Sequence, residues 1–176
     1  MKRKIRISAI LMTALLLLLA LSACSKKEEG NSGIPLEQSA ESNSVTVKTP
    51  KNFVVDIEQE GRLIDISPLD YSYTISIDEE LFEDMSSETF EEILEYHKSE
   101  STMIDNPYGD IAGRPTAVFL DDAESTDAVM VFVDLTGKTE GVDYLWIEIF
   151  PSDDSSPEEI YKKEEVMAIL QSIKIK

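Results

Sequence analysis

The segment that constrains the fold most is residues 144–150, because it is apolar on both of its faces. Successive side chains of a strand point to opposite faces. One face therefore carries Tyr144, Trp146, Glu148 and Phe150, and the other carries Leu145, Ile147 and Ile149. A strand with apolar side chains on both faces needs a packed layer on each side. We therefore expect this segment at the centre of a sheet.

The remaining strands are predicted from alternation of apolar and polar residues. Before the middle of the chain these segments are separated by Pro50, Gly61 and Pro68, and after it Gly137 and Gly141 bracket a turn typical of a meander. Ile173 and Ile175 indicate a short closing strand. The other predicted strands are residues 45–49, 53–59, 63–67, 73–78, 114–121 and 128–135.

Two helices are predicted from apolar residues at helical spacing. The first covers residues 89–98, where Phe90, Ile93 and Leu94 share a stripe with His97 behind capping serines. The second begins with Ser156 and a proline in its first turn, has a capping box, and continues as an apolar stripe to Leu170. Together with the strands, the two helices predict one α+β domain.

The order of these elements resembles the Mog/PsbP domains. The resemblance covers residues 45–176 and involves an early strand pair, a helix, a glycine-containing loop, a meander and a C-terminal segment. It implies a twisted antiparallel β-sheet sandwiched by helices, an α/β/α arrangement, and a non-enzymatic binding or assembly role. The residues that carry it are Val45-Thr46-Val47 with Pro50 and Phe53, Tyr108-Gly109-Asp110-Ile111-Ala112-Gly113-Arg114-Pro115-Thr116-Ala117, and Ile169-Leu170-Gln171-Ser172-Ile173.

The N-terminus has the layout of a bacterial secretory signal. Four cations precede a largely apolar run over residues 9–21, which is shorter than the roughly 20 residues that span a bilayer. Leu21-Ser22-Ala23-Cys24 then resembles a lipobox, which implies cleavage between Ala23 and Cys24 and attachment of diacylglycerol to the Cys24 thiol. The alternatives are an ordinary secretory signal with a chance cysteine, or an uncleaved anchor.

Cys24 is the only cysteine, so the chain can form no internal disulfide and no thiolate metal site elsewhere. We expect three parts: a signal peptide at 1–23, a lipidated cysteine with a flexible tether at 24–44, and a single domain at 45–176. The lipid would hold the domain at the membrane, facing outside the cytoplasm. Because Ser25 rather than aspartate follows Cys24, a two-membrane envelope would place the protein in its outer membrane.

The charge of the chain restricts its partners. Loss of the signal's four cations would leave 12 of 16 basic residues against 35 acidic ones, a formal net charge of −23. Such a surface repels nucleic acid and anionic lipid. It favours cations or a basic protein partner, although a solvated acidic coat that aids solubility explains the same composition.

Side chains that could support catalysis or bind metal are few, and no cofactor motif occurs. His97 is the only histidine and shares the apolar stripe of the first helix, which indicates a packing role. An acidic stretch could supply oxygens to calcium, which needs six to eight, but its spacing does not match an EF-hand loop. The alternative function is therefore a calcium-binding or weakly hydrolytic enzyme that uses Asp121, Asp122, Glu124 and Asp127.

Aromatic residues offer a further binding option, a groove for peptide or glycan. Alternation predicts that Trp146 packs in the core, whereas Tyr108 lies in a loop beside Pro107 and Gly109 and is the better candidate for an exposed contact. The full candidate set is Tyr71, Tyr73, Tyr108, Tyr144 and Trp146. The favoured function is a lipid-anchored, non-enzymatic binding or assembly module.

Overall fold

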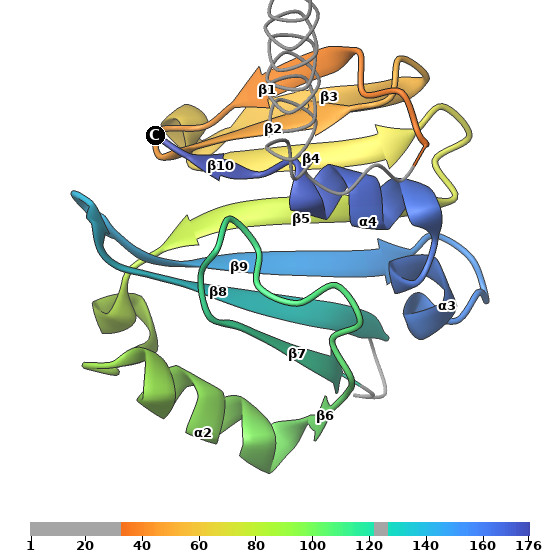
Figure 1. Cartoon of the computed structure of the whole chain (residues 1–176). Helices are drawn as coiled ribbons and strands as arrows, with labels where there is room; N and C mark the ends of the chain where they lie inside the picture. Colours follow the sequence, from red (N-terminus) through yellow and green to blue (C-terminus); the bar gives the residue numbers. More distant parts are fainter. Residues whose placement is uncertain (1–32, 122–126) are drawn as a thin grey trace, which may run out of the picture.

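The computed structural model describes residues 33–121 and 127–176, and it contains two antiparallel sheets (Figure 1). The small sheet has the order β1-β2-β10, formed by Gln38–Glu41, Val45–Thr49 and Lys174–Ile175. The large sheet has the order β3-β4-β5-β9-β8-β7-β6. Its strands are β3 (Phe53–Glu58), β4 (Leu63–Pro68), β5 (Tyr73–Glu80), β6 (Thr102–Met103), β7 (Thr116–Asp121), β8 (Ala128–Thr139) and β9 (Val142–Pro151).

The apolar segment at 144–150 lies within β9, the fourth of the seven strands of the large sheet. It pairs with β5 on one side and with β8 on the other, so the predicted central position is confirmed. Leu145, Ile147 and Ile149 are fully buried in the main core, and Tyr144 is fully buried in a second cluster on the opposite face.

The β8–β9 hairpin is longer than the sequence predicted. Gly141, with φ 77°, lies in the tight turn, whereas Gly137, with φ 69°, lies inside β8. The pairing of β8 with β9 changes register between Asp134 and Thr139. Positive φ is inexpensive for glycine, so Gly137 lets the strand bulge and continue, where we expected it to end at residue 135.

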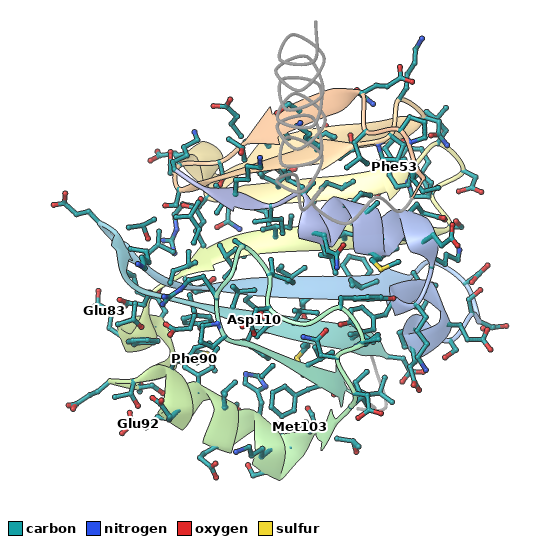
Figure 2. The ribbon with its side chains drawn as sticks, viewed as in Figure 1. Phe53, Glu83, Phe90, Glu92, Met103 and Asp110 are labelled. Carbon is teal, nitrogen blue, oxygen red and sulfur yellow. The ribbon has the colours of Figure 1, made fainter. Side chains whose placement is uncertain are left out.

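The first predicted helix is confirmed as α2 (Phe90–Glu100). Its N-cap is Thr89, whose Oγ1 accepts a hydrogen bond from the Glu92 backbone N–H at 3.3 Å. Phe90, Ile93 and His97 are its buried residues, and Figure 2 shows Phe90 toward the sheet and Glu92 pointing away. The remaining 3-10 turns are η1 (Gln59–Gly61) and η2 (Phe82–Met85).

The second predicted helix is divided into α3 (Pro157–Tyr161) and α4 (Glu164–Gln171). Lys163 interrupts it with an extended conformation, φ −66° and ψ 141°. Ser156 precedes α3 as expected, but its side chain makes no capping hydrogen bond. Both pieces therefore depend on packing, through Ile160 and Tyr161 in α3 and Val166, Ile169 and Leu170 in α4.

The predicted α/β/α sandwich is wrong. The described chain is rich in strand, with two sheets and a few short helices in place of one sheet between two helical layers. The second predicted helix is divided into pieces too short to form a helical layer. The small sheet covers part of the face of the large sheet that we expected helices to cover. That sheet includes β1, so ordered structure begins within residues 24–44, which we expected to be a tether.

Two hydrophobic clusters hold the sheet between them. The main core joins one face of the large sheet to the small sheet, α3 and α4. In this core, Ile77 and Ile147 of the large sheet belong to the same cluster as Val47 of the small sheet and Leu170 of α4. The second cluster packs α2 and η2 onto the opposite face, over β7, β8 and β9. Its buried members are Phe82, Phe90, Ile93, Phe119, Met130, Phe132 and Tyr144.

A buried carboxylate connects the two sheets. Glu79, near the end of β5, is 0% exposed. Its Oε1 accepts hydrogen bonds from the Ser42 hydroxyl and, at 2.7 Å, from the Ser44 backbone N–H, and its Oε2 accepts one from the Ser44 hydroxyl at 3.1 Å. Ser42 and Ser44 belong to the β1–β2 turn, so one side chain of the large sheet anchors a hairpin of the small sheet.

Replacing Glu79 by glutamine should lower the free energy of unfolding by about 2–3 kcal/mol, because charge-assisted hydrogen bonds to a buried carboxylate are lost and an amide N–H₂ takes the place of one acceptor. Urea unfolding of the domain measures the change. Glu58→Gln, at an exposed position of β3, is the matched control and should change stability by less than about 0.5 kcal/mol. Equal effects of the two substitutions would contradict this role.

Candidate functional site

One side of the large sheet is only partly covered. Along β5, Tyr73, Ile75, Ile77 and Glu79 are buried, whereas the residues between them are half-buried. On the opposite face of the sheet from the main core, α2 packs over β7, β8 and β9. The strands β3, β4 and β5 present several polar side chains on that face. We call this region the open face; it carries Asp56, Asp65, Ser76, Asp78, Glu80, Trp146 and Glu148.

The strand registers bring the carboxylates of the open face into a row. Asp56 of β3 lies directly opposite Asp65 of β4, Asp65 lies opposite Ser76 of β5, and Ser76 lies opposite Glu148 of β9. Like charges directly opposite one another on adjacent strands are destabilising. The sheet therefore carries an unfavourable charge pattern that packing alone does not require.

A second group of acids lies one step along β5. Burial, together with the charge and hydrogen bonding of Asp78, raises the pKa of Glu80 to about 7. Arg62 partly offsets this effect, since its Nη2 lies 3.9 Å from Glu80 Oε2 and 3.7 Å from Asp84 Oδ2. The Arg62 guanidinium also donates to the Glu79 carbonyl, which orients it at the edge of the group.

Glu148 extends this behaviour across the sheet. Its pKa is raised first by burial and then by the charges of Asp121 and Asp78. Both Glu80 and Glu148 are therefore carboxyls whose charged forms lack sufficient compensation. A cation placed over the open face would stabilise their ionised forms.

Trp146 forms the border between the open face and the part covered by α2. It lies opposite Asp78, and its ring centroid is 6.0 Å from those of Phe132 and His97. Its indole Nε1 and Asp78 Oδ1 are both buried without a hydrogen-bond partner among the described residues. Because unpaired buried polar atoms are costly, they indicate a place where further contacts can be made.

His97 is confirmed as a packing residue. It is 6% exposed, and its ring centroid lies 4.4 Å from that of Phe132. Burial lowers its pKa, against the opposing effect of Asp121, so it is neutral at pH 7. Its Nε2 and the nearby Tyr144 hydroxyl also lack partners among the described residues, and burial raises the pKa of that hydroxyl, with Glu80 adding to the effect.

The sequence-predicted calcium residues lie only partly within the described chain. Asp122 and Glu124 fall outside it, while Asp121 and Asp127 lie at its two edges. Asp127 lines a groove of about 560 Å³ that Glu148 also borders. Over residues 33–121 and 127–176, no three His, Cys, Asp or Glu side chains are arranged to hold a metal ion.

The predicted anchor residues Ala23 and Cys24 lie outside the described residues, as does the chain up to residue 32. Within the described part, no helix is both long and apolar enough to cross a membrane.

The structure disperses the candidate aromatic residues. Tyr73 lines a groove at one end of the molecule, and the exposed Tyr71 lies close by in sequence. Tyr108 lies in a loop as predicted, but its hydroxyl donates to the Tyr161 carbonyl at 2.6 Å, so it is a packing residue as well. Tyr144 and Trp146 lie on the second face. These side chains do not form a single aromatic groove.

Sequence reasoning missed the acids of the open face. Asp65 and Glu148 each lie in a predicted strand between buried apolar neighbours, and Asp78 lies between the buried Ile77 and the buried Glu79; this alternation was the available signal. The register that aligns them comes from strand order, which no single strand discloses.

No family model matches the chain, and comparisons with curated proteins and with solved structures found no match either. The Mog/PsbP resemblance therefore stays a prediction, and the helical layering that it implied is the part contradicted by the structure.

The raised pKa of Glu80 predicts a pH dependence of stability. In the unfolded chain this carboxyl ionises near 4.5, and in the folded domain near 7, so the folded state binds more protons between these values. Its contribution is fully present below pH 4.5 and is lost as the pH rises through about 7. Glu80→Gln should therefore remove part of the decline in melting temperature between pH 5 and pH 8, by about 4 °C after allowance for solvent screening of this partly exposed carboxyl.

Thermal unfolding followed by circular dichroism at the two pH values measures this effect. Glu58→Gln changes the net charge equally at an exposed site on the edge strand of the same sheet, and should leave the decline unchanged. If both variants flatten the profile to the same extent, net charge rather than Glu80 controls it.

Proposed function

We propose that this protein is a lipid-anchored extracytoplasmic binding module, whose open face receives a basic segment of a protein partner. The observation that carries the proposal is the cross-strand row of carboxylates beside Trp146, with Asp56 and Asp65 directly opposed. The lipobox-like Leu21-Ser22-Ala23-Cys24 supports attachment to the membrane through Cys24.

The chemistry of the open face favours lysine or arginine side chains. A cation there would relieve repulsion within the row, and it would lower the raised pKa values of Glu80 and Glu148 toward their ordinary range. The half-buried ring of Trp146 adds a surface on which a guanidinium or ammonium can stack. Among the described residues, Arg62 forms an ion pair with this group of acids, and it contacts Glu80 at the edge of the open face.

An extended basic peptide fits this surface better than a compact metal ion. The acids are distributed over β3, β4, β5 and β9, and neighbouring strands in a sheet are about 4.8 Å apart. A row of that kind extends farther than one ion's coordination sphere, whereas successive basic side chains can follow it. Charge complementarity would speed association and favour basic partners over acidic ones.

A lysine- and arginine-rich peptide without aromatic residues should change the fluorescence of Trp146, the only tryptophan. Because the carboxylates of Asp78 and Glu148 are partly buried, their contacts with a basic side chain are poorly screened by solvent. Asp78→Asn combined with Glu148→Gln should therefore weaken binding about tenfold, equivalent to about 1.4 kcal/mol. Binding should also strengthen between pH 6 and pH 8, as Glu80 ionises. Titration of the domain with the peptide measures both effects.

The matched control is Glu83→Gln combined with Glu91→Gln, which removes the same charge from exposed positions on η2 and α2. We expect a loss of less than about twofold there. Equal weakening by both double variants would mean that the peptide responds to net charge alone, and the open face would not be the site.

A further inference from the structure

A groove that is separate from the open face lies beside the first residues of the described chain. This groove, of about 760 Å³, lies at the end of the molecule where β4 ends and β5 begins. Ile34 and Pro35, at the start of the described chain, form part of its wall, together with Phe53, Leu69, Tyr73 and Lys163. Figure 2 shows Phe53 at this end, and Figure 1 shows α4 reaching it.

The β4–β5 turn next to this groove presents apolar side chains to solvent. Leu69 is 65% exposed and Tyr71 is 56% exposed. Hydrogen bonds fix the turn: the Leu69 N–H donates to the Asn52 carbonyl at 3.2 Å, and the Tyr71 N–H donates to the Pro68 carbonyl at 2.9 Å. The two side chains are therefore held outward by an ordered backbone.

The length of chain before the groove determines what can reach it. Eight residues lie between Cys24 and Gly33. Fully extended, the chain from Cys24 to Gly33 spans at most about 30 Å. Lipid attached to Cys24 would thus hold this end of the domain within a short distance of the bilayer. The connecting segment carries Lys26 and Lys27 beside Glu28 and Glu29. The groove is bordered by Lys51 and Lys163 together with Glu37, Asp70 and Glu165. Docking therefore depends on the tether and the exposed apolar side chains.

We infer that this end of the domain docks on the bilayer surface, with Leu69 and Tyr71 inserted at the level of the lipid headgroups. The inference depends on the proposed lipidation of Cys24. Tyrosine is favoured at this depth because its ring is amphipathic, and burial of a leucine adds apolar area. Two such side chains bind weakly alone, but the tether raises the effective concentration of the membrane around them.

Docking in this manner also sets the orientation of the domain. The strands β4 and β5 end and begin, respectively, at the Leu69–Tyr71 turn, so they lead away from the membrane. The open face then stands to the side of the anchored domain, accessible to a partner at the same surface.

The experiment uses the full lipidated protein, extracted from membranes and reconstituted in phosphatidylcholine vesicles. Intact mass first establishes that Cys24 carries lipid. Lipidation consumes the native thiol, so Leu69→Cys introduces a unique site for an environment-sensitive NBD dye. The matched control is Ile57→Cys, which is 51% exposed and lies toward the opposite end of β3.

We expect the dye at position 69 to shift to shorter wavelength on vesicles, and nitroxide lipids to quench it at least about twofold more than the dye at position 57. Equal, water-like emission from both sites on vesicles that retain the protein would overturn docking while leaving the anchor intact. A concentration-dependent shift without vesicles would overturn it in favour of contact between two copies. Absence of lipid on Cys24 would overturn it as well, whereas peptide binding by the domain is a separate readout of the proposed function.

Discussion

The position of the small sheet on the large sheet depends on one buried carboxylate. Glu79 is the last buried residue of β5 and the point at which an apolar series ends in a charge. Removing a carboxylate from water is costly unless hydrogen bonds replace the lost solvation, and the β1–β2 turn supplies them through Ser42 and Ser44. The small sheet is thereby held over the main core, so that α4 and β10 complete the same layer.

The same strand, β5, also lies at the centre of the proposed binding site. Alternation along β5 sends Ile75 and Ile77 into the core and Ser76 and Asp78 to the opposite side, where β4 and β9 contribute acids at matched positions. Inside, the carboxylate of Glu79 has its partners. On the open face, Asp78 and Glu148 lack sufficient compensation, and the raised pKa of Glu148 reflects that difference. We interpret the contrast as structural support on one side and partner recognition on the other.

Much of this arrangement was predictable from local sequence pattern. The central position of β9 followed from its two apolar faces, and α2 followed from helical spacing behind its cap. The predictions that were wrong depended on contacts between residues far apart in the sequence. The short polar strand β1 forms because β2 pairs with it. Lys163 divides an apolar stripe that the sequence predicted to be a single helix. The acids of the open face were visible singly, but their alignment required the order of strands in the sheet.

The most direct test of the account is to map the contact of a basic peptide by ¹H–¹⁵N nuclear magnetic resonance, in which the single tryptophan gives one indole N–H signal. We predict the largest shifts at the Trp146 indole and at the backbone amides of Asp65, Asp78 and Glu148. Shifts spread over exposed acidic positions such as Asp153, Asp154 and Glu91, with the Trp146 indole unchanged, would contradict a specific site on the open face.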